Sequence, residues 1–235
     1  MEVNRVFMHG DCHADFRWLK YFCEEEKTTK DDLMIILGDS GINYWASTRD
    51  YVLKEYLAEL PITLLCVHGN HEERPFNIFS YHEMEMFEGV VYVEDDFPNI
   101  LFAKDGENYQ IKNHRYLILG GAYSIDKQYR LAFGHRWYAS EQPSEEIKDY
   151  VAKQIVKYNK EFDIVLSHTA PREFEPVEMF LPGVDQSEVD KSTEEWLDEI
   201  REMISYNKWY FGHYHGDSVR TNKVTMLFHK TIEIE

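Results

Sequence analysis

The 235-residue sequence lacks long hydrophobic runs and contains only three cysteines. No apolar stretch approaches the roughly 20 residues of a membrane helix, so no membrane association is expected. Cys12, Cys23 and Cys66 form neither a C-x-x-C motif nor a paired set, which is typical of reduced thiols in a reducing compartment. The first residues lack the cationic start and apolar segment of a signal peptide. We therefore expect a cytoplasmic protein without a disulfide framework.

Positive charge is also scarce, because 25 Lys and Arg residues stand against 43 Asp and Glu residues, for a net charge of −18. Binding of long nucleic acid requires clustered Lys and Arg, so the composition argues against such a partner. A small anionic substrate remains compatible with the composition, since a bound divalent cation would reverse the field around it. The sequence does not indicate an oligomeric state.

No repeat, low-complexity tract or linker divides the chain, and its length suits one domain over residues 1–235. Apolar residues at helical spacing predict helices over residues 15–26, 48–59 and 144–160 and from Ser192 onward. Ser192 and Glu195 have the spacing of a capping box. Short strands are predicted within residues 90–122 and a terminal hairpin over 219–234. This α/β (α+β) pattern favours two packed sheets with helices outside them.

Five short apolar runs each end in residues that bind metal ions well. The runs cover residues 3–8, 33–37, 62–67, 164–166 and 209–211, and such runs are typical of buried strands. Because ligands gather at the carboxyl ends of strands in α/β sheets, we expect these side chains on one rim. Carboxylate, amide and imidazole donors suit Mn, Fe, Zn or Ni better than a closed structural zinc site. The polar residues after the runs include Asp11, His13, Asp39, Asn70, His71, His168, His213 and His215.

Taken in order, these motifs resemble those of the calcineurin-like metallophosphoesterase family. The motifs are D-x-H at 11–13, G-D at 38–39, G-N-H-E at 69–72, a strand-end His at 168 and G-H-x-H at 212–215. The resemblance implies a metallophosphatase-like four-layer sandwich, with two mixed β-sheets flanked by helices and two divalent metal ions such as manganese. The ligands so implied are Asp11, His13 and His215 for one ion, Asn70, His168 and His213 for the other, and Asp39 as the bridge.

The resemblance also implies an activity. A small phosphomonoester or phosphodiester, a nucleotide among them, would be hydrolysed by a metal-bound hydroxide. His71 would then be the general acid that protonates the leaving alkoxide. The catalytic residues so implied are Asp39, Asn70 and His71. Glu72 either orients His71 or stabilises the turn.

Specific residues argue against other functions of the same fold. Ile42 and Asn43 replace the second Asp and the Arg of the G-D-x-V-D-R-G motif in Ser/Thr protein phosphatases, and His68 replaces the Arg before G-N-H-E. These departures disfavour a protein phosphatase, although Glu72 is shared with those enzymes. A non-catalytic scaffold of the same fold is the alternative from another class, but such proteins have lost the histidine present here as His71. A purely structural metal site would instead make folding metal-dependent.

Residues that contact the substrate must then lie outside the metal motifs. Arg74, Arg130 and Arg172 lie near the motifs or near a strand end, and arginine can bind phosphate bidentately. We therefore expect a phosphate clamp from among these three. The candidates for an aromatic wall around the organic group are Tyr44, Trp45 and Tyr123.

Overall fold

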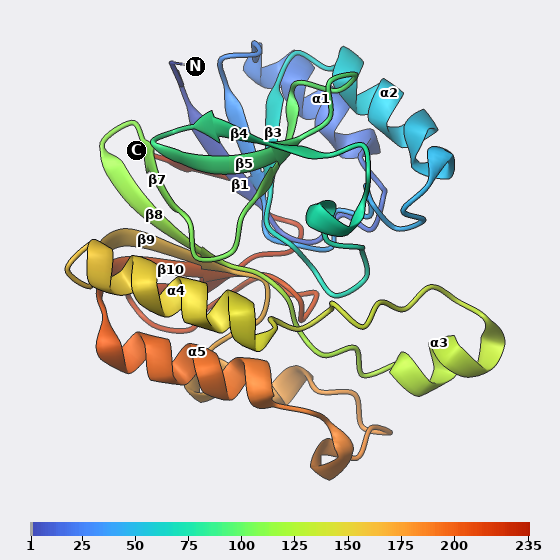
Figure 1. Cartoon of the computed structure of the whole chain (residues 1–235), viewed down its shortest axis with the longest axis vertical. Helices are drawn as coiled ribbons and strands as arrows, with labels where there is room; N and C mark the ends of the chain where they lie inside the picture. The colour runs from blue at the N-terminus through green and yellow to red at the C-terminus, as the bar shows by residue number, and fades with distance from the viewer. Residues whose placement is uncertain (1) are drawn as a thin grey trace.

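The computed structural model describes residues 2–235, and two β-sheets form its centre (Figure 1). The strands of the first sheet are β1 (Val6–His9), β2 (Leu33–Ile36), β3 (Thr63–Cys66), β4 (His82–Met86), β5 (Gly89–Val93), β6 (Ile100–Ala103) and β13 (Ile232–Ile234). Those of the second are β7 (Asn108–Ile111), β8 (His114–Leu119), β9 (Glu161–Ser167), β10 (Ser205–Phe211), β11 (Ser218–Val219) and β12 (Val224–Met226). Their spatial orders are β13-β1-β2-β3-β6-β5-β4 and β11-β12-β10-β9-β8-β7.

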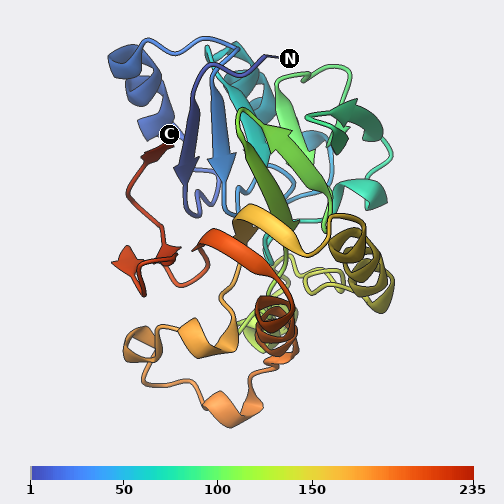
Figure 2. The same ribbon diagram turned by 90° about the vertical axis from the view of Figure 1, so that its left-hand side faces the viewer.

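Helices cover the outer face of each sheet, which gives four layers (Figures 1 and 2). On the first sheet lie α1 (Arg17–Glu26) and α2 (Tyr51–Glu59), and on the second α4 (Glu145–Lys157) and α5 (Ser192–Met203). The short helix α3 (Lys127–Phe133) extends away from these layers (Figure 1). The predicted sandwich of two mixed sheets flanked by helices is confirmed.

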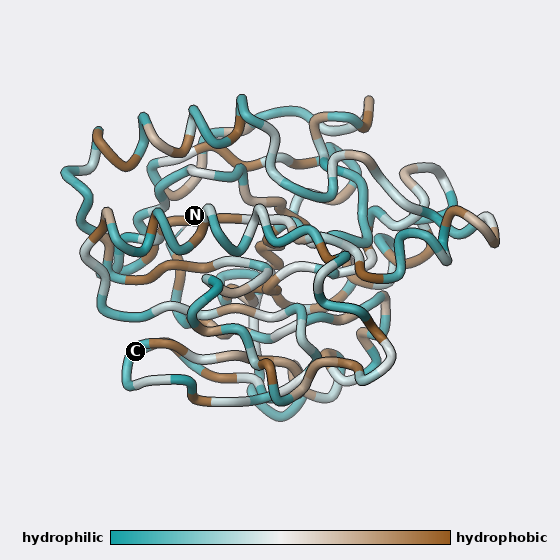
Figure 3. The backbone as a smooth tube through the Cα atoms, turned by 90° about the horizontal axis from the view of Figure 1, so that it is seen from below, coloured by the Kyte–Doolittle hydropathy of each residue, from teal (hydrophilic) through white to brown (hydrophobic). Residues whose placement is uncertain are grey.

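Alternation along the central strands explains why they read as continuous apolar runs. In β2, Leu33 and Ile35 pack between the sheets, whereas Met34 and Ile36 pack against the helical layer. Successive side chains of a strand point to opposite faces, so a strand covered on both sides must be apolar throughout. The helices instead alternate hydrophobic and hydrophilic residues along their length (Figure 3). None of the helices within residues 2–235 has the length and apolar character that crossing a membrane requires.

The parallel strands bring the predicted ligands to one edge. β1, β2, β3 and β6 run parallel to one another, and so do β8, β9, β10 and β12. The motif residues follow the carboxyl ends of β1, β2, β3, β9 and β10. One rim therefore collects residues from both the first and the last parts of the chain.

Helix bounds differ modestly from the sequence predictions. The helix predicted over 15–26 begins at Arg17, and that over 144–160 runs from Glu145 to Lys157 with Ser144 as its N-cap. The segment over 48–59 starts with a 3₁₀ turn, η1 (Thr48–Asp50), before α2. The capping box predicted at the start of α5 is wrong, because Ser192 is already helical and accepts a hydrogen bond from Gln142.

The terminal hairpin is only partly as predicted. β11 and β12 pair antiparallel, as a hairpin requires. Ile232–Ile234, however, crosses to the other sheet and pairs antiparallel with β1. A three-residue strand on an edge carries too little pattern in its sequence to reveal its partner.

Candidate metal centre

The first group of converging side chains comes from the loops after β1 and β10. His13 Nε2 lies 2.9 Å from His215 Nε2, and these atoms lie 3.8 Å and 3.5 Å from Asp11 Oδ2. Asp11 Oδ1 accepts a hydrogen bond from the backbone N–H of His213 at 2.8 Å. Asp11 Oδ2 is buried without a hydrogen-bond partner among residues 2–235. A buried, unpaired carboxylate oxygen facing two imidazole nitrogens fits a bound cation.

The second group surrounds Asn70 and His168. His168 Nε2 lies 2.8 Å from Asn70 Oδ1 and 3.7 Å from Asp39 Oδ2, and the His213 ring centroid lies 5.0 Å from that of His168. Asp39 Oδ2 also lies 4.0 Å from His13 Nε2 in the first group. Asp39 therefore lies between the groups, as a bridging carboxylate must.

Hydrogen bonds hold the ligand atoms of the second group in orientation. His168 Nδ1 contacts the Leu37 carbonyl at 2.8 Å; donation there leaves Nε2 as the atom with a free lone pair. The amide nitrogen of Asn70 donates to Ser124 Oγ at 2.9 Å, which turns Asn70 Oδ1 toward His168. Asp39 Oδ1 accepts the backbone N–H of His71 at 2.8 Å. Asp39, Asn70 and His168 thus each present one atom to the centre and use another for support.

Two glycines allow the ligand loops to approach one another. A Cβ at Gly38 would overlap the His168 ring, and the φ of +93° at Gly38 is itself unfavourable for other residues. A Cβ at Gly212 would overlap the carboxylate of Asp11. Several ligands also have left-handed backbone angles, a form of strain that concentrates at functional sites. They are His13, Asp39, His213 and His215, with φ values of 45°, 46°, 67° and 52°.

Burial and neighbouring charges together set the protonation of the centre. Burial alone would raise the pKa of Asp39, but His168, His71 and His13 hold that pKa below its usual range. Burial keeps the pKa of His213 well below its usual value. The neighbouring Asp11 carboxylate raises the pKa of His215. An ionised carboxylate beside a neutral imidazole is the state in which such groups bind metals.

His71 faces the centre without joining either ligand group. Its Nε2 lies 3.9 Å from Asp39 Oδ2 and 3.2 Å from Arg130 Nη2. Arg130 is in turn held by Asp126, with Nε 2.8 Å from the carboxylate. Burial lowers the pKa of His71, and Asp39 opposes that effect. An imidazole in this position can exchange a proton with a group bound at the centre.

The other two candidate arginines lie away from the centre, which corrects the expectation that they clamp phosphate. Arg74 is buried in an ion pair with Asp105 and also donates to the Ser140 carbonyl at 2.7 Å. Arg172 is half exposed and pairs with Glu195 on α5. Of the three, the structure brings only Arg130 to the ligands.

Glu72 stabilises the turn and does not contact His71. Its carboxylate accepts hydrogen bonds from the Ser40 hydroxyl at 2.5 Å and from the backbone N–H groups of Gly41 and Gly69 at 3.1 and 3.2 Å. It therefore ties the loop after β2 to the loop after β3. The sequence leaves two roles open for Glu72, and these contacts support stabilisation of the turn.

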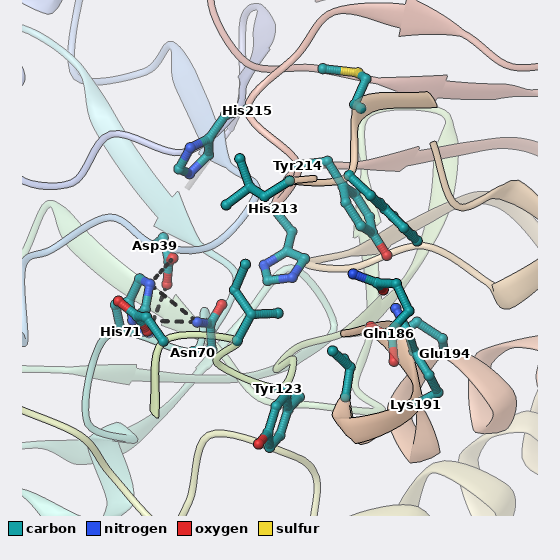
Figure 4. A pocket seen from close by; sticks show the side chains of 16 residues that line it. Asp39, Asn70, His71, Tyr123, Gln186, Lys191, Glu194, His213, Tyr214 and His215 are labelled. Carbon is teal, nitrogen blue, oxygen red and sulfur yellow. Dashed lines mark hydrogen bonds and ion pairs between the residues drawn. The ribbon is translucent and has the colours of Figure 1, made fainter. Parts of the chain in front are cut away.

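An apolar pocket beside the ligands was not predicted. Its cavity volume is about 350 Å³, and Asp39, Asn70 and His213 line its inner end (Figure 4). The opposite wall comes from residues 179–191, between β9 and α5, which include the 3₁₀ turn η5 (Gln186–Glu188). That segment has no motif and no periodic apolar pattern, so the sequence indicates only the aromatic Tyr123 for this region. Tyr44 and Trp45 line a separate cavity.

Glu194, which lines the apolar pocket, should make the free energy of unfolding depend on pH. Burial raises the pKa of its carboxyl to about 7 from 4.5, and one oxygen accepts a hydrogen bond from Thr169 at 2.7 Å. The unfolded chain releases this proton near pH 4.5 while the folded chain keeps it, so the stability contributed by the neutral acid is lost as pH rises to about 7. At about 1.4 kcal/mol per pH unit, the loss approaches about 3 kcal/mol.

Glu194→Gln should remove this dependence. Urea unfolding at pH 4.5 and pH 8 should show wild type losing up to about 3 kcal/mol more than the variant between the two pH values. Glu199→Gln, an exposed carboxyl on the same helix, serves as the control and should behave as wild type. Parallel pH profiles for Glu194→Gln and wild type would show that Glu194 is ionised in the folded chain.

Comparison with known proteins agrees with this architecture. The family model for calcineurin-like phosphoesterase matches residues 5–217. The crystal structure of TT1561 of Thermus thermophilus is similar, with a TM-score of 0.52 and 14% identity over 95% of this chain and 88% of that one. Phosphopantetheinyl hydrolase (PptH) from Mycobacterium tuberculosis has a TM-score of 0.48 and 12% identity over 95% of this chain and 89% of that one. No curated protein matches the sequence. The match over residues 5–217 shows that this chain belongs to the calcineurin-like phosphoesterase family.

Proposed function

We propose that this chain hydrolyses small phosphoesters at a centre of two divalent metal ions. Membership of the family implies metal-dependent phosphoester hydrolysis. The observation that carries the proposal for this chain is the position of Asp39 between two groups of converging ligand atoms, 4.0 Å from His13 and 3.7 Å from His168. The unpaired buried oxygen of Asp11 supports a cation in the same place.

The donors divide between two positions, and their chemistry suits manganese or another first-row metal. When bound, two divalent ions would activate water at neutral pH and offset the charge that develops on the phosphoryl group. The residues that would hold the first ion are Asp11, His13 and His215, those for the second are Asn70, His168 and His213, and Asp39 would contact both.

His71 would supply the proton for the leaving group, and Arg130 would contact the phosphoryl group. His71 Nε2 faces the space beside Asp39 and would deliver a proton to the leaving oxygen. Its pKa is lowered by burial, but a bound phosphoryl anion would favour the protonated ring. Arg130 Nη2 lies beside the same nitrogen and would contact a phosphoryl oxygen.

Charge and cysteine chemistry support our proposals for the size of the substrate and for the location of the protein. A net charge of −18 disfavours long nucleic acid, so we propose a small phosphoester or nucleotide. Cys12, Cys23 and Cys66 are buried free thiols, which supports a reducing, cytoplasmic location.

A phosphoester panel tests the function. Metal-free protein would be loaded separately with Mn²⁺, Ni²⁺, Zn²⁺ and Mg²⁺ and assayed on p-nitrophenyl phosphate, its bis ester and nucleotides. We expect turnover that requires metal and disappears with chelator. Stoichiometric metal binding without turnover of any ester would instead favour the scaffold alternative.

A further inference from the structure

Two cavities meet at His71, and each has its own walls. One is the apolar pocket described above, with a volume of about 350 Å³. The other, here the arginine pocket, has a volume of about 260 Å³ and is lined by Tyr44, Trp45, Arg49 and Arg130. His13 and His71 also line it, so both cavities open onto the metal centre.

The apolar pocket suits an uncharged organic group. Lys191 is the only lysine or arginine among the described residues that line it. Its ammonium group already forms an ion pair and a cation–π contact, because Nζ lies 2.5 Å from the Glu175 carboxylate and 4.7 Å from the ring centroid of Phe180. A second phosphate in this pocket would therefore meet no lysine or arginine whose charge is free, among the described residues that line it. The apolar side chains of the wall are Ile125, Met179, Phe180, Leu181, Val189 and Tyr214.

The arginine pocket suits a planar group. The Arg49 guanidinium carbon lies 4.9 Å from the ring centroid of Trp45, and the rings of Tyr44 and Trp45 meet edge to face at 5.0 Å. Aromatic edges and guanidinium planes both contact aromatic rings favourably. This pocket is therefore chemically distinct from the apolar one.

The number of pockets beside the centre favours a diester over a monoester. His71 lines both cavities, one of which has an apolar wall while the other is lined by Tyr44 and Trp45. A phosphomonoester has one organic group and would leave one pocket empty, whereas a diester has two organic groups, which matches two pockets.

We propose that the substrate is a phosphodiester, with an apolar organic group in the apolar pocket and a planar aromatic group in the arginine pocket. This inference rests on the proposed phosphohydrolase function. In the reaction, the oxygen of water forms a bond to phosphorus while the bond from phosphorus to one organic oxygen breaks. The released oxygen takes up a proton, so the products are a phosphomonoester and an alcohol.

Two variants on the outer walls test the two pockets separately. Trp45→Ala shortens a wall of the arginine pocket, and Leu181→Ala, at a residue that is 60% exposed, shortens a wall of the apolar pocket. On bis(p-nitrophenyl) phosphate, each should lower kcat/KM about tenfold, and the double variant about a hundredfold, because each aryl group uses its own pocket. On methyl p-nitrophenyl phosphate, which has one aryl group, only one variant should have this effect.

A binding measurement gives the same comparison without turnover. Calorimetric titration of metal-loaded protein with diphenyl phosphate should show weaker binding in both variants than in wild type. Titration with phenyl phosphate, which has one aryl group, should show weaker binding in only one of the two variants. The controls are Tyr21→Ala on α1 and Val156→Ala on α4, two exposed positions outside both pockets. Both should leave every value unchanged.

Three outcomes would overturn the inference. Hydrolysis of p-nitrophenyl phosphate but not of the bis ester would show a monoesterase. An effect below twofold for either variant on the bis ester, or equal effects of both on the methyl ester, would show that the pockets do not each hold one group. Absence of turnover on any ester with any metal would instead refute the proposed function, and the inference with it.

Discussion

Asp39→Asn should remove most of the bound metal and lower kcat/KM by more than about 100-fold. Substitution of a residue that contacts a metal ligand, and not the metal itself, typically lowers metal affinity or activity 10–100-fold. Asp39 faces both ligand groups directly, so its substitution should have a larger effect. Its Oδ2 lies 3.7 Å from His168 Nε2 and 4.0 Å from His13 Nε2. The amide has nearly the same shape and can still accept the backbone N–H of His71 through Oδ1, so the turn should be retained. What is lost is the negative charge between the two ions.

Metal analysis and kinetics on the same preparation separate the possible causes. Asp96→Asn, which changes an exposed carboxylate in a loop, should behave as wild type. Circular dichroism should show that Asp39→Asn is folded. If Asp39→Asn kept its metal and more than about a tenth of the activity, Asp39 would not bridge two ions.

His71→Asn should keep both ions and lose activity in proportion to how poorly the alcohol leaves. General acids typically contribute 10²–10⁴-fold, so we expect a loss of about 100-fold or more on phenyl and alkyl esters. Esters of p-nitrophenol should be affected far less, because nitrophenolate leaves without a proton. The backbone N–H of His71, which donates to Asp39 at 2.8 Å, is unchanged by the substitution.

The control for His71→Asn is His82→Asn, a half-exposed histidine on β4 that pairs with Asp95. It should change neither metal content nor the dependence on the leaving group. An equal loss on nitrophenyl and alkyl esters would mean that His71 positions the substrate and does not supply the proton. Loss of metal would make it a ligand or a support for one.

Most of the centre could be predicted because its signal is local. Each ligand lies within four residues of the carboxyl end of a strand. Parallel strands bring these ends to one rim whatever the details of packing. Which arginine reaches the centre could not be predicted in the same way. Arg74 and Arg130 look alike in sequence, but Asp105 buries the first in an ion pair while Asp126 holds the second beside His71. Asp126 is a local partner of Arg130, four residues away, but Asp105 and His71 are far in sequence from the arginines that they contact, so those contacts depend on the tertiary structure.

The walls around the centre were also beyond sequence reasoning. Residues 179–191 contain only short 3₁₀ structure without apolar periodicity, yet they form a side of the apolar pocket. Helix α3 has no buried residue, so it has no apolar stripe to reveal it. The capping box predicted at Ser192 failed because Ser192 already lies inside the helix and its hydroxyl accepts a hydrogen bond from Gln142. A capping box does form at Ser47 and Asp50.

Counting metal ions per chain tests the dinuclear centre most directly. Purified protein would be stripped with chelator, equilibrated with Mn²⁺, dialysed and analysed by elemental mass spectrometry together with Asp39→Asn. We expect two ions per wild-type chain and less than one in the variant, because Asp39 Oδ2 faces both groups of ligands. One ion or none in wild type, or two ions retained by Asp39→Asn, would contradict a centre bridged by Asp39.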